Sequence, residues 1–227
     1  KEKDLELIEN PRVAYYSMLV YQIEIYDQAK KKLWIPSEKR IIRVPTGGGK
    51  TKIAMEIVTD FFNEHTDAKI LWLAHSQELL EQATKEFIKN WRVRGLKPIH
   101  LNRAWGTNSV KPDITGPELI VAGLQKLISF YKNKGKIKAD LIIFDEAHHS
   151  AAKEYLKVIE KSSKIPTRLL GLTATPARGE EDETQKLANI FNDNPPITID
   201  THDKYLTPIQ FLQKIGMLSK LKFKILS

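Results

Sequence analysis

The stretch Pro45-Thr46-Gly47-Gly48-Gly49-Lys50-Thr51 has the residue types needed to bind a chain of phosphates. An apolar run at 41–44 precedes it, and a helical pattern of apolar residues at 53–61 follows it. Glycine adopts backbone dihedrals that a β-carbon blocks, so the glycines can turn successive N–H groups into one concavity at the helix start. Lys50 would add a positive charge for the outer phosphates, and the Thr51 hydroxyl could ligate Mg²⁺. The predicted nucleotide-binding residues in this loop are Thr46, Gly47, Gly48, Gly49, Lys50 and Thr51.

The loop departs at one position from the general phosphate-loop pattern G-x-x-x-x-G-K-[ST], because Val44 stands where the first glycine is expected. A glycine turn that only caps a helix is the alternative interpretation. That alternative does not explain why Lys50-Thr51 directly follow the last glycine. We therefore favour a phosphate site.

An acidic pair, Asp145-Glu146, stands at the end of the apolar run at 141–144. A carboxylate at the end of a buried strand beside a phosphate loop can hold Mg²⁺, and the next carboxylate can orient and deprotonate a water. We therefore predict Asp145 and Thr51 as magnesium ligands and Glu146 as the general base, with Lys50 in the same catalytic group. A surface turn is the alternative for an isolated acidic pair, and the upstream phosphate loop disfavours it.

Two adjacent histidines, His148 and His149, follow the acidic pair. They would project differently from a turn, and no third ligand is spaced to join them, so a histidine metal site is disfavoured. For His148 we favour a hydrogen-bonding role beside the terminal phosphate.

Apolar runs typical of buried strands alternate with helical patterns along the chain. Strands are predicted at 41–44, 69–74, 118–122, 141–144 and 168–172, with a short one near 98–101. Helices are predicted at 13–32, 77–88, 124–131 and 151–161, and residues 1–11 have a helical rhythm. This alternation predicts an α/β fold with a parallel sheet flanked by helices on both faces. The carboxyl ends of the strands should share one edge, where such sheets bind ligands.

Composition restricts the function classes. The 227 residues contain no cysteine, which excludes disulfides and thiolate metal sites and fits a cytoplasmic protein. No apolar run approaches the roughly 18 residues of a membrane span, and no signal peptide is visible. The net charge of +8 favours polyanions such as nucleic acid. Five lysines between Lys126 and Lys138 add a basic cluster, although a solvated helix face explains such a cluster more simply.

Three colinear motifs resemble motifs I, II and III of the superfamily 2 helicases. They are the phosphate loop, Asp145-Glu146-Ala147-His148 and Thr173-Ala174-Thr175-Pro176, and the stretch at 73–82 resembles motif Ia. The resemblance is to the branch that contains bacterial DEAD/DEAH-box helicases, XPB-type repair helicases and type I and III restriction motors. It implies a RecA-like P-loop NTPase domain, the first of two, that uses ATP with Mg²⁺.

The resemblance also assigns roles to individual positions. Gln22 resembles the upstream glutamine that contacts the adenine edge, although Leu19-Val20 stand where the family often has Leu-Arg. A solvated helix glutamine is the alternative for Gln22. A further group resembles the residues that couple hydrolysis to domain movement: His148, Thr173, Thr175 and Arg178.

Nucleic acid is the partner that the resemblance implies, with DNA favoured over RNA. Its backbone would cross the sheet edge at His75, Ser76 and Gln125. The family usually has Thr-x-Gln at the last of these places, whereas this chain has Gly123-Leu124-Gln125 and lacks the hydroxyl. Helix capping and plain solvation are the alternatives for these three side chains. Such contacts would position a strand without selecting its sequence.

The predicted division is an N-terminal extension at 1–14, a RecA-like domain at 15–210 and a tail or linker at 211–227. We expect a chain that begins at Lys1 to be a fragment or a processed form, without the second RecA-like domain. Loss of an arginine finger from such a domain typically costs on the order of 10³ to 10⁵ in rate, so the piece alone should be a poor ATPase. Two other functions stay open: the DNA-translocating motor of a restriction or anti-phage system, and a nucleotide-gated binding module without productive hydrolysis.

Overall fold

The computed structural model of the chain describes residues 5–8, 17–111, 114–133, 135–146, 152–174 and 189–219. Within them, eight strands form one sheet in the order β1-β4-β5-β3-β6-β7-β2-β8. The strands are β1 (Leu5–Ile8), β2 (Lys39–Arg43), β3 (Lys69–Ala74), β4 (Ile99–Ala104), β5 (Glu118–Gly123), β6 (Ala139–Asp145), β7 (Ser163–Thr173) and β8 (Ile197–Thr198). The helices are α1 (Val20–Leu33), α2 (Lys50–Glu64), α3 (Gln77–Arg94), α4 (Leu124–Lys132), α5 (Ala152–Ser162) and α7 (Pro208–Lys214).

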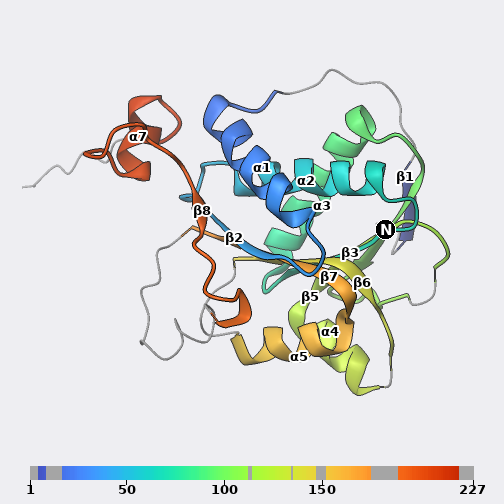
Figure 1. Ribbon diagram of the computed structural model, residues 1–227. Helices are drawn as coiled ribbons and strands as arrows, with labels where there is room; N and C mark the ends of the chain where they lie inside the picture. The colour runs from blue at the N-terminus through green and yellow to red at the C-terminus, as the bar shows by residue number, and fades with distance from the viewer. Residues whose placement is uncertain are drawn as a thin grey trace, which may run out of the picture.

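The sheet is parallel except at β1, which pairs antiparallel with β4. Helices α1, α2 and α3 cover one face and α4 and α5 the other (Figure 1). Because helices cover both faces of the sheet, the central strands carry apolar side chains on both sides. In β3, Ile70 and Trp72 belong to the core under α1–α3, whereas Leu71 and Leu73 belong to the core over α4 and α5. The predicted α/β fold is confirmed.

Two expectations for the N-terminal segment were wrong. Residues 5–8 form a strand rather than part of a helix, because their backbone pairs with β4 from Leu5↔Asn102 to Ile8↔Ile99. The alternation in Leu5-Glu6-Leu7 already has the two-residue period of a strand. The first predicted helix begins at Val20 rather than near residue 13. Leu19 is extended with φ −75° and ψ 158°, so residues 17–19 lie outside the helix.

The C-terminal part of the described chain packs on the domain. Helix α7 spans the predicted boundary between residues 210 and 211, and Leu212 on it is fully buried in the core under α1–α3. Thr207 begins this helix as an N-cap, since its hydroxyl accepts a hydrogen bond from the Gln210 N–H at 3.3 Å. The division at 210 stays a prediction.

Candidate nucleotide site and the adjoining pocket

The phosphate loop connects the end of β2 to the first residue of α2. Gly47 and Gly49 both have φ of +82°, a conformation that L side chains rarely adopt. A Cβ on Gly49 would also lie 2.3 Å from Gln22 Nε2. The turn is closed by the Gly48 N–H, which donates to the Pro45 carbonyl at 2.9 Å. The loop therefore brings the N–H groups at the start of α2 to the sheet edge, as a phosphate site requires.

Val44, the position that departs from the general pattern, is a core residue beneath this loop. Its side chain is fully buried, and its N–H donates to the Thr173 carbonyl at 3.1 Å. A Cβ on Gly48 would lie 2.5 Å from Val44 Cγ1, so the glycine makes room for the valine. Val44 therefore packs beneath the turn, and the turn is still closed by the Gly48 N–H.

The sheet order brings the acidic pair next to this loop. Strand β7 lies between β6 and β2, with Asp145 opposite Leu172 and Arg43 opposite Thr173. Lys50 Nζ lies 3.2 Å from Glu146 Oε1, and only 8% and 17% of the two side chains are exposed. Lys50 and Glu146, almost a hundred residues apart in the chain, therefore form a partly buried ion pair. Thr173, at the end of the intervening strand, is also buried.

Asp145 is 2% exposed beside Glu146. Burial raises the pKa of Asp145 from its ordinary 3.8 to about 6, and the neighbouring Glu146 charge raises it further while Lys50 opposes the shift. Two carboxylates with one lysine leave an excess of negative charge, and a divalent cation would relieve it.

The donor set fits Mg²⁺, which prefers oxygen ligands and binds through one or two carboxylates plus substrate phosphates. Asp145 and the Thr51 hydroxyl both line the same pocket. Among the described residues no group of three or more His, Cys, Asp or Glu side chains could hold a metal by protein ligands alone.

The backbone at Glu146 is in the left-handed region, with φ of 54°. This costs a residue with a side chain about 1 to 3 kcal/mol, which the surroundings must offset. The Tyr155 hydroxyl on α5 donates to the Glu146 carbonyl at 3.4 Å. The Tyr155 ring lies 4.6 Å from the Phe144 ring on β6, so the tyrosine is anchored to the same strand.

A cavity of about 620 Å³, the phosphate-loop pocket, joins these groups. It is lined by Ser17, Leu19, Gln22, Thr46, Gly47, Gly49, Lys50, Thr51, Lys52, Leu79, Gln82, Glu86, Lys89, Asp145, Glu146 and Met217. The structure thus gathers in one cavity the predicted catalytic residues, the predicted magnesium ligands and all but one of the predicted nucleotide-binding residues. Gly48, the exception, is part of the turn but does not line the cavity. The roles of all these residues stay predictions.

Gln22 braces the phosphate loop rather than standing in solvent. It is 4% exposed, and its Nε2 donates to the Gly48 carbonyl and to the Tyr21 hydroxyl, both at 3.3 Å. Its Oε1 accepts from the Leu19 N–H at 3.0 Å. The Tyr21 hydroxyl donates to the same Gly48 carbonyl at 2.9 Å, a contact that the sequence did not indicate. Because both amide N–H donors of Gln22 are engaged, donation to adenine would have to replace one of these bonds.

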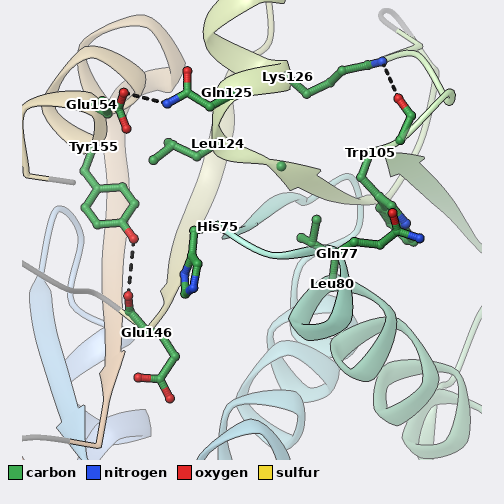
Figure 2. A pocket seen from close by; sticks show the side chains of 12 residues that line it. His75, Gln77, Leu80, Trp105, Leu124, Gln125, Lys126, Glu146, Glu154 and Tyr155 are labelled. Atoms are coloured by element: carbon green, nitrogen blue, oxygen red, sulfur yellow. Dashed lines mark hydrogen bonds between the residues drawn. The ribbon is translucent and has the colours of Figure 1, made fainter. Parts of the chain in front are cut away.

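A second cavity of about 470 Å³ lies beside the first, at the ends of β3 and β5, and we call it the strand-end pocket (Figure 2). It is lined by His75, Gln77, Leu80, Trp105, Gly106, Gly123, Leu124, Gln125, Lys126, Glu146, Glu154 and Tyr155. Glu146 lines both cavities. The starts of α3 and α4 both meet this pocket, so the positive ends of two helices face it.

The predicted nucleic-acid residues lie at this pocket. His75 and Gln125 are exposed and line it, whereas Ser76 caps α3 by accepting from the Leu79 N–H at 3.3 Å. Gln125 Nε2 donates to Glu154 Oε1 at 2.6 Å, and Lys126 Nζ donates to the Gly106 carbonyl at 3.0 Å (Figure 2). Sequence reasoning placed Lys126 only in a lysine cluster.

Glu154 and Tyr155 were missed because they follow the acidic pair by eight or more residues in an ordinary helical pattern. Their position over the site is set by how α5 packs on the sheet. Of the predicted coupling residues, His148, Thr175 and Arg178 lie outside the described residues, as does His149.

Comparison with known proteins agrees with this arrangement. Residues 15–178 match the family described as "Type III restriction enzyme, res subunit". The chain belongs to this family. The matched region contains the phosphate loop, the acidic pair and the end of β7, which are the segments that build the candidate site.

Two relatives extend the comparison. Putative helicase 22 of a Sulfolobus islandicus filamentous virus is 28% identical over 98% of this chain and 41% of its own length. The DNA 3'-5' translocase XPB2 of Sulfurisphaera tokodaii is 30% identical over 79% of this chain and 37% of its own length. The chain therefore spans about two fifths of the length of these relatives.

Among solved structures, the Hef helicase domain of Pyrococcus furiosus superposes with a TM-score of 0.57 and 24% identity, covering 85% of this chain and 38% of that one. This likeness shows the fold. Together with the family match and the helicase relatives, it makes this chain the first RecA-like domain of a superfamily 2 helicase-type ATPase. None of the helices in the described ranges is long and apolar enough to cross a membrane.

Proposed function

We propose that this domain binds Mg-ATP in the phosphate-loop pocket and hydrolyses it as part of a nucleic-acid-dependent motor. The observation that carries the proposal is the contact of 3.2 Å between Lys50 Nζ and Glu146 Oε1. That contact supports a single site built from the phosphate loop and the acidic pair.

The Lys50–Glu146 ion pair holds two of the proposed catalytic groups against each other. A lysine held by the carboxylate cannot bind the outer phosphates, and a carboxylate held by the lysine is a poor base. The terminal phosphate of ATP competes for Lys50, because it offers several charged oxygens within the same pocket. Glu146 can then accept a proton from the attacking water. Mg²⁺ on Asp145 and Thr51 would neutralise charge on the phosphates.

The strand-end pocket is the proposed place for a nucleic-acid backbone. The N-termini of α3 and α4 favour phosphate, and the Lys126 ammonium lies at the rim. The net charge of +8 adds a general attraction for polyanions. We favour DNA over RNA because one of the relatives is a DNA translocase by name. A cytoplasmic location, where ATP and nucleic acid are both available, is part of the proposal.

We propose further that a second RecA-like domain completes the catalytic site in the whole protein. The relatives are more than twice as long as the matched part, which leaves room for such a domain. An arginine finger from it would contribute on the order of 10³ to 10⁵ in rate.

The test is ATP turnover by the full-length protein with single-stranded DNA, duplex DNA, RNA or no nucleic acid. We expect turnover that rises with DNA, and its loss in Lys50→Ala. An equal rate under all four conditions would overturn the nucleic-acid-dependent motor. Unchanged turnover in Lys50→Ala would overturn the assignment of the phosphate-loop pocket.

A restriction-type motor, which translocates along DNA without separating its strands, is a second candidate. The family description favours it, since that family is named for a restriction enzyme subunit. Displacement of a third strand from a DNA triplex, without release of either duplex strand, would support this candidate. Release of a duplex strand would favour a helicase.

A further inference from the structure

The side-chain contacts at the start of α5 link the two pockets. Tyr155 contacts the residue that we propose as the general base, and its neighbour Glu154 contacts the strand-end pocket (Figure 2). Neither residue belongs to a motif identified in the sequence. The link crosses three elements, since Gln125 lies on α4, Glu154 and Tyr155 on α5, and Glu146 directly after β6.

The Tyr155 hydroxyl is held in a buried position beside Glu146. The side chain is 2% exposed, and its ring packs on Phe144 with 4.6 Å between centroids. Burial, followed by the charges of Asp145, Glu146 and Glu154, raises the pKa of Tyr155 well above its usual range. The hydroxyl therefore keeps its proton and donates to the Glu146 carbonyl at 3.4 Å.

Glu146 needs such a partner because its backbone is in the left-handed region, with φ of 54°. Its carbonyl faces Tyr155 and its carboxylate faces Lys50, 3.2 Å away. A rotation of this peptide would move the carboxylate relative to the phosphates. Misplacement of a catalytic group by about 1 Å can lower a rate by roughly 100-fold.

Glu154 links the position of Glu146 to the binding of a phosphate in the strand-end pocket. Its carboxylate accepts from Gln125 Nε2 at 2.6 Å, across the pocket from α5 to α4. A phosphate that enters to contact Gln125 competes for that amide and repels the Glu154 carboxylate. Glu154 and Tyr155 are consecutive residues in the first turn of α5, so a shift of that turn would move both side chains.

We propose that Tyr155 is a positioning residue for Glu146, and that Glu154 makes this positioning respond to a phosphate backbone in the strand-end pocket. This inference rests on the proposed function, since it assigns the regulation of the same site.

The experiment compares Tyr155→Phe with Tyr131→Phe in the full-length protein. Phenylalanine keeps the ring and removes only the hydroxyl. Tyr131 is the matched control, because it is also partly buried and its hydroxyl bonds Ser162 at 2.5 Å, away from both pockets. For each variant we would measure kcat and KM for ATP with saturating duplex DNA, the kcat without DNA, and the thermal unfolding midpoint.

We expect Tyr155→Phe to lower the DNA-stimulated kcat roughly tenfold with an unchanged KM, because the hydroxyl acts on the base rather than on ATP binding. Tyr131→Phe should leave kcat unchanged. Equal kcat values for the two variants, or a kcat loss explained by unfolding at the assay temperature, would overturn the positioning role.

Glu154→Gln tests the second half of the proposal. The amide removes the charge that repels phosphate, so the DNA concentration for half-maximal stimulation should fall several-fold. In a Tyr155→Phe background this substitution should no longer lower the DNA concentration for half-maximal stimulation, because the link to Glu146 is cut. Independent effects in the double variant would overturn the link. Absence of ATP turnover in the unsubstituted protein would instead overturn the proposed function, and this inference with it.

Discussion

The two pockets lie side by side at one edge of the sheet, yet they are built in different ways. The phosphate-loop pocket is formed largely by backbone: three glycines, a turn closed by one carbonyl and the N–H groups at the start of α2. The strand-end pocket is lined in part by side chains from α4 and α5, such as Gln125 bonded to Glu154. Among the residues that the structure describes, Glu146 alone lines both.

This difference indicates which of the two pockets is fixed in shape and which can be regulated. A backbone cradle fixes the position of a ligand, because its dihedrals leave few alternatives. A pocket closed by exposed side chains can change, since breaking one hydrogen bond between surface groups costs little. The pair of cavities therefore suits a fixed chemical site next to an adjustable sensing site.

Glu146→Gln should have the largest effect of the variants considered, and it tests the chemistry of the phosphate-loop pocket. The amide keeps the shape of the side chain but cannot take the proton, so kcat should fall about 100- to 10,000-fold. Nucleotide affinity should be kept, because Lys50 is released from its ion pair with Glu146. DNA-stimulated turnover and the affinity for a non-hydrolysable ATP analogue would be measured together. Glu160→Gln, an exposed position on α5, is the control. A variant that turns over at the wild-type rate would rule out Glu146 as the base.

Gly49→Ala tests whether the phosphate cradle depends on backbone shape. The φ of +82° and the approach of Gln22 Nε2 to 2.3 Å both oppose a Cβ. The left-handed strain costs about 1 to 2 kcal/mol and the overlap about 1 to 3 kcal/mol. We expect unfolding at lower denaturant and at least about a tenfold weaker binding of the ATP analogue.

Gly116→Ala is the matched control for Gly49→Ala. Gly116 has φ of +90° but nothing within 4 Å of a built Cβ, so only the strain remains. It should lose about 1 to 2 kcal/mol of stability and keep its nucleotide affinity. If both variants bound nucleotide equally well, the close packing of Gln22 on the loop would have no role in binding.

The same contrast explains what the sequence could predict. Gly47-Gly48-Gly49-Lys50 encodes its own local shape, and the strand-helix alternation places its neighbours, so the nucleotide site could be predicted from the sequence. The Gln125–Glu154 contact could not, because it depends on the packing of α4 beside α5. The strand at 5–8 was missed because its alternation covers only a few residues, and its pairing with β4 depends on residues about a hundred positions away.

Asp145→Asn tests the charge balance of the nucleotide site. In the folded chain the pKa of Asp145 is about 6 against an ordinary 3.8, so the folded state binds more protons between these values. Its contribution to the free energy of unfolding therefore falls as pH rises from about 4 to 6. Asparagine removes this penalty. Without nucleotide and metal, the variant should be more stable at pH 7 by up to about 3 kcal/mol, because one pKa unit corresponds to about 1.4 kcal/mol.

The gain from Asp145→Asn should vanish near pH 4, where the wild-type carboxyl is protonated in the folded state. Urea denaturation at several pH values would measure it, with the exposed Asp27→Asn on α1 as control. A variant less stable than the wild type at pH 7 would mean that the attraction of Asp145 to Lys50 exceeds the cost of its burial. The same variant should lose magnesium-dependent nucleotide binding.

Lys126→Ala produces the smallest expected effect and tests the strand-end pocket alone. Lys126 Nζ reaches only the Gly106 carbonyl at the rim, so its ammonium is available to one phosphate. Removing one phosphate contact should weaken DNA binding several-fold at low salt, equally for all sequences, and reduce the salt slope by about one. Lys132→Ala, exposed at the far end of α4, is the control for a general loss of positive charge. Fluorescence anisotropy over a range of salt concentrations would measure both slopes. Equal slopes for the two variants would mean that DNA is attracted by the whole basic surface and not held in this pocket, which would leave Glu154 without a ligand to sense.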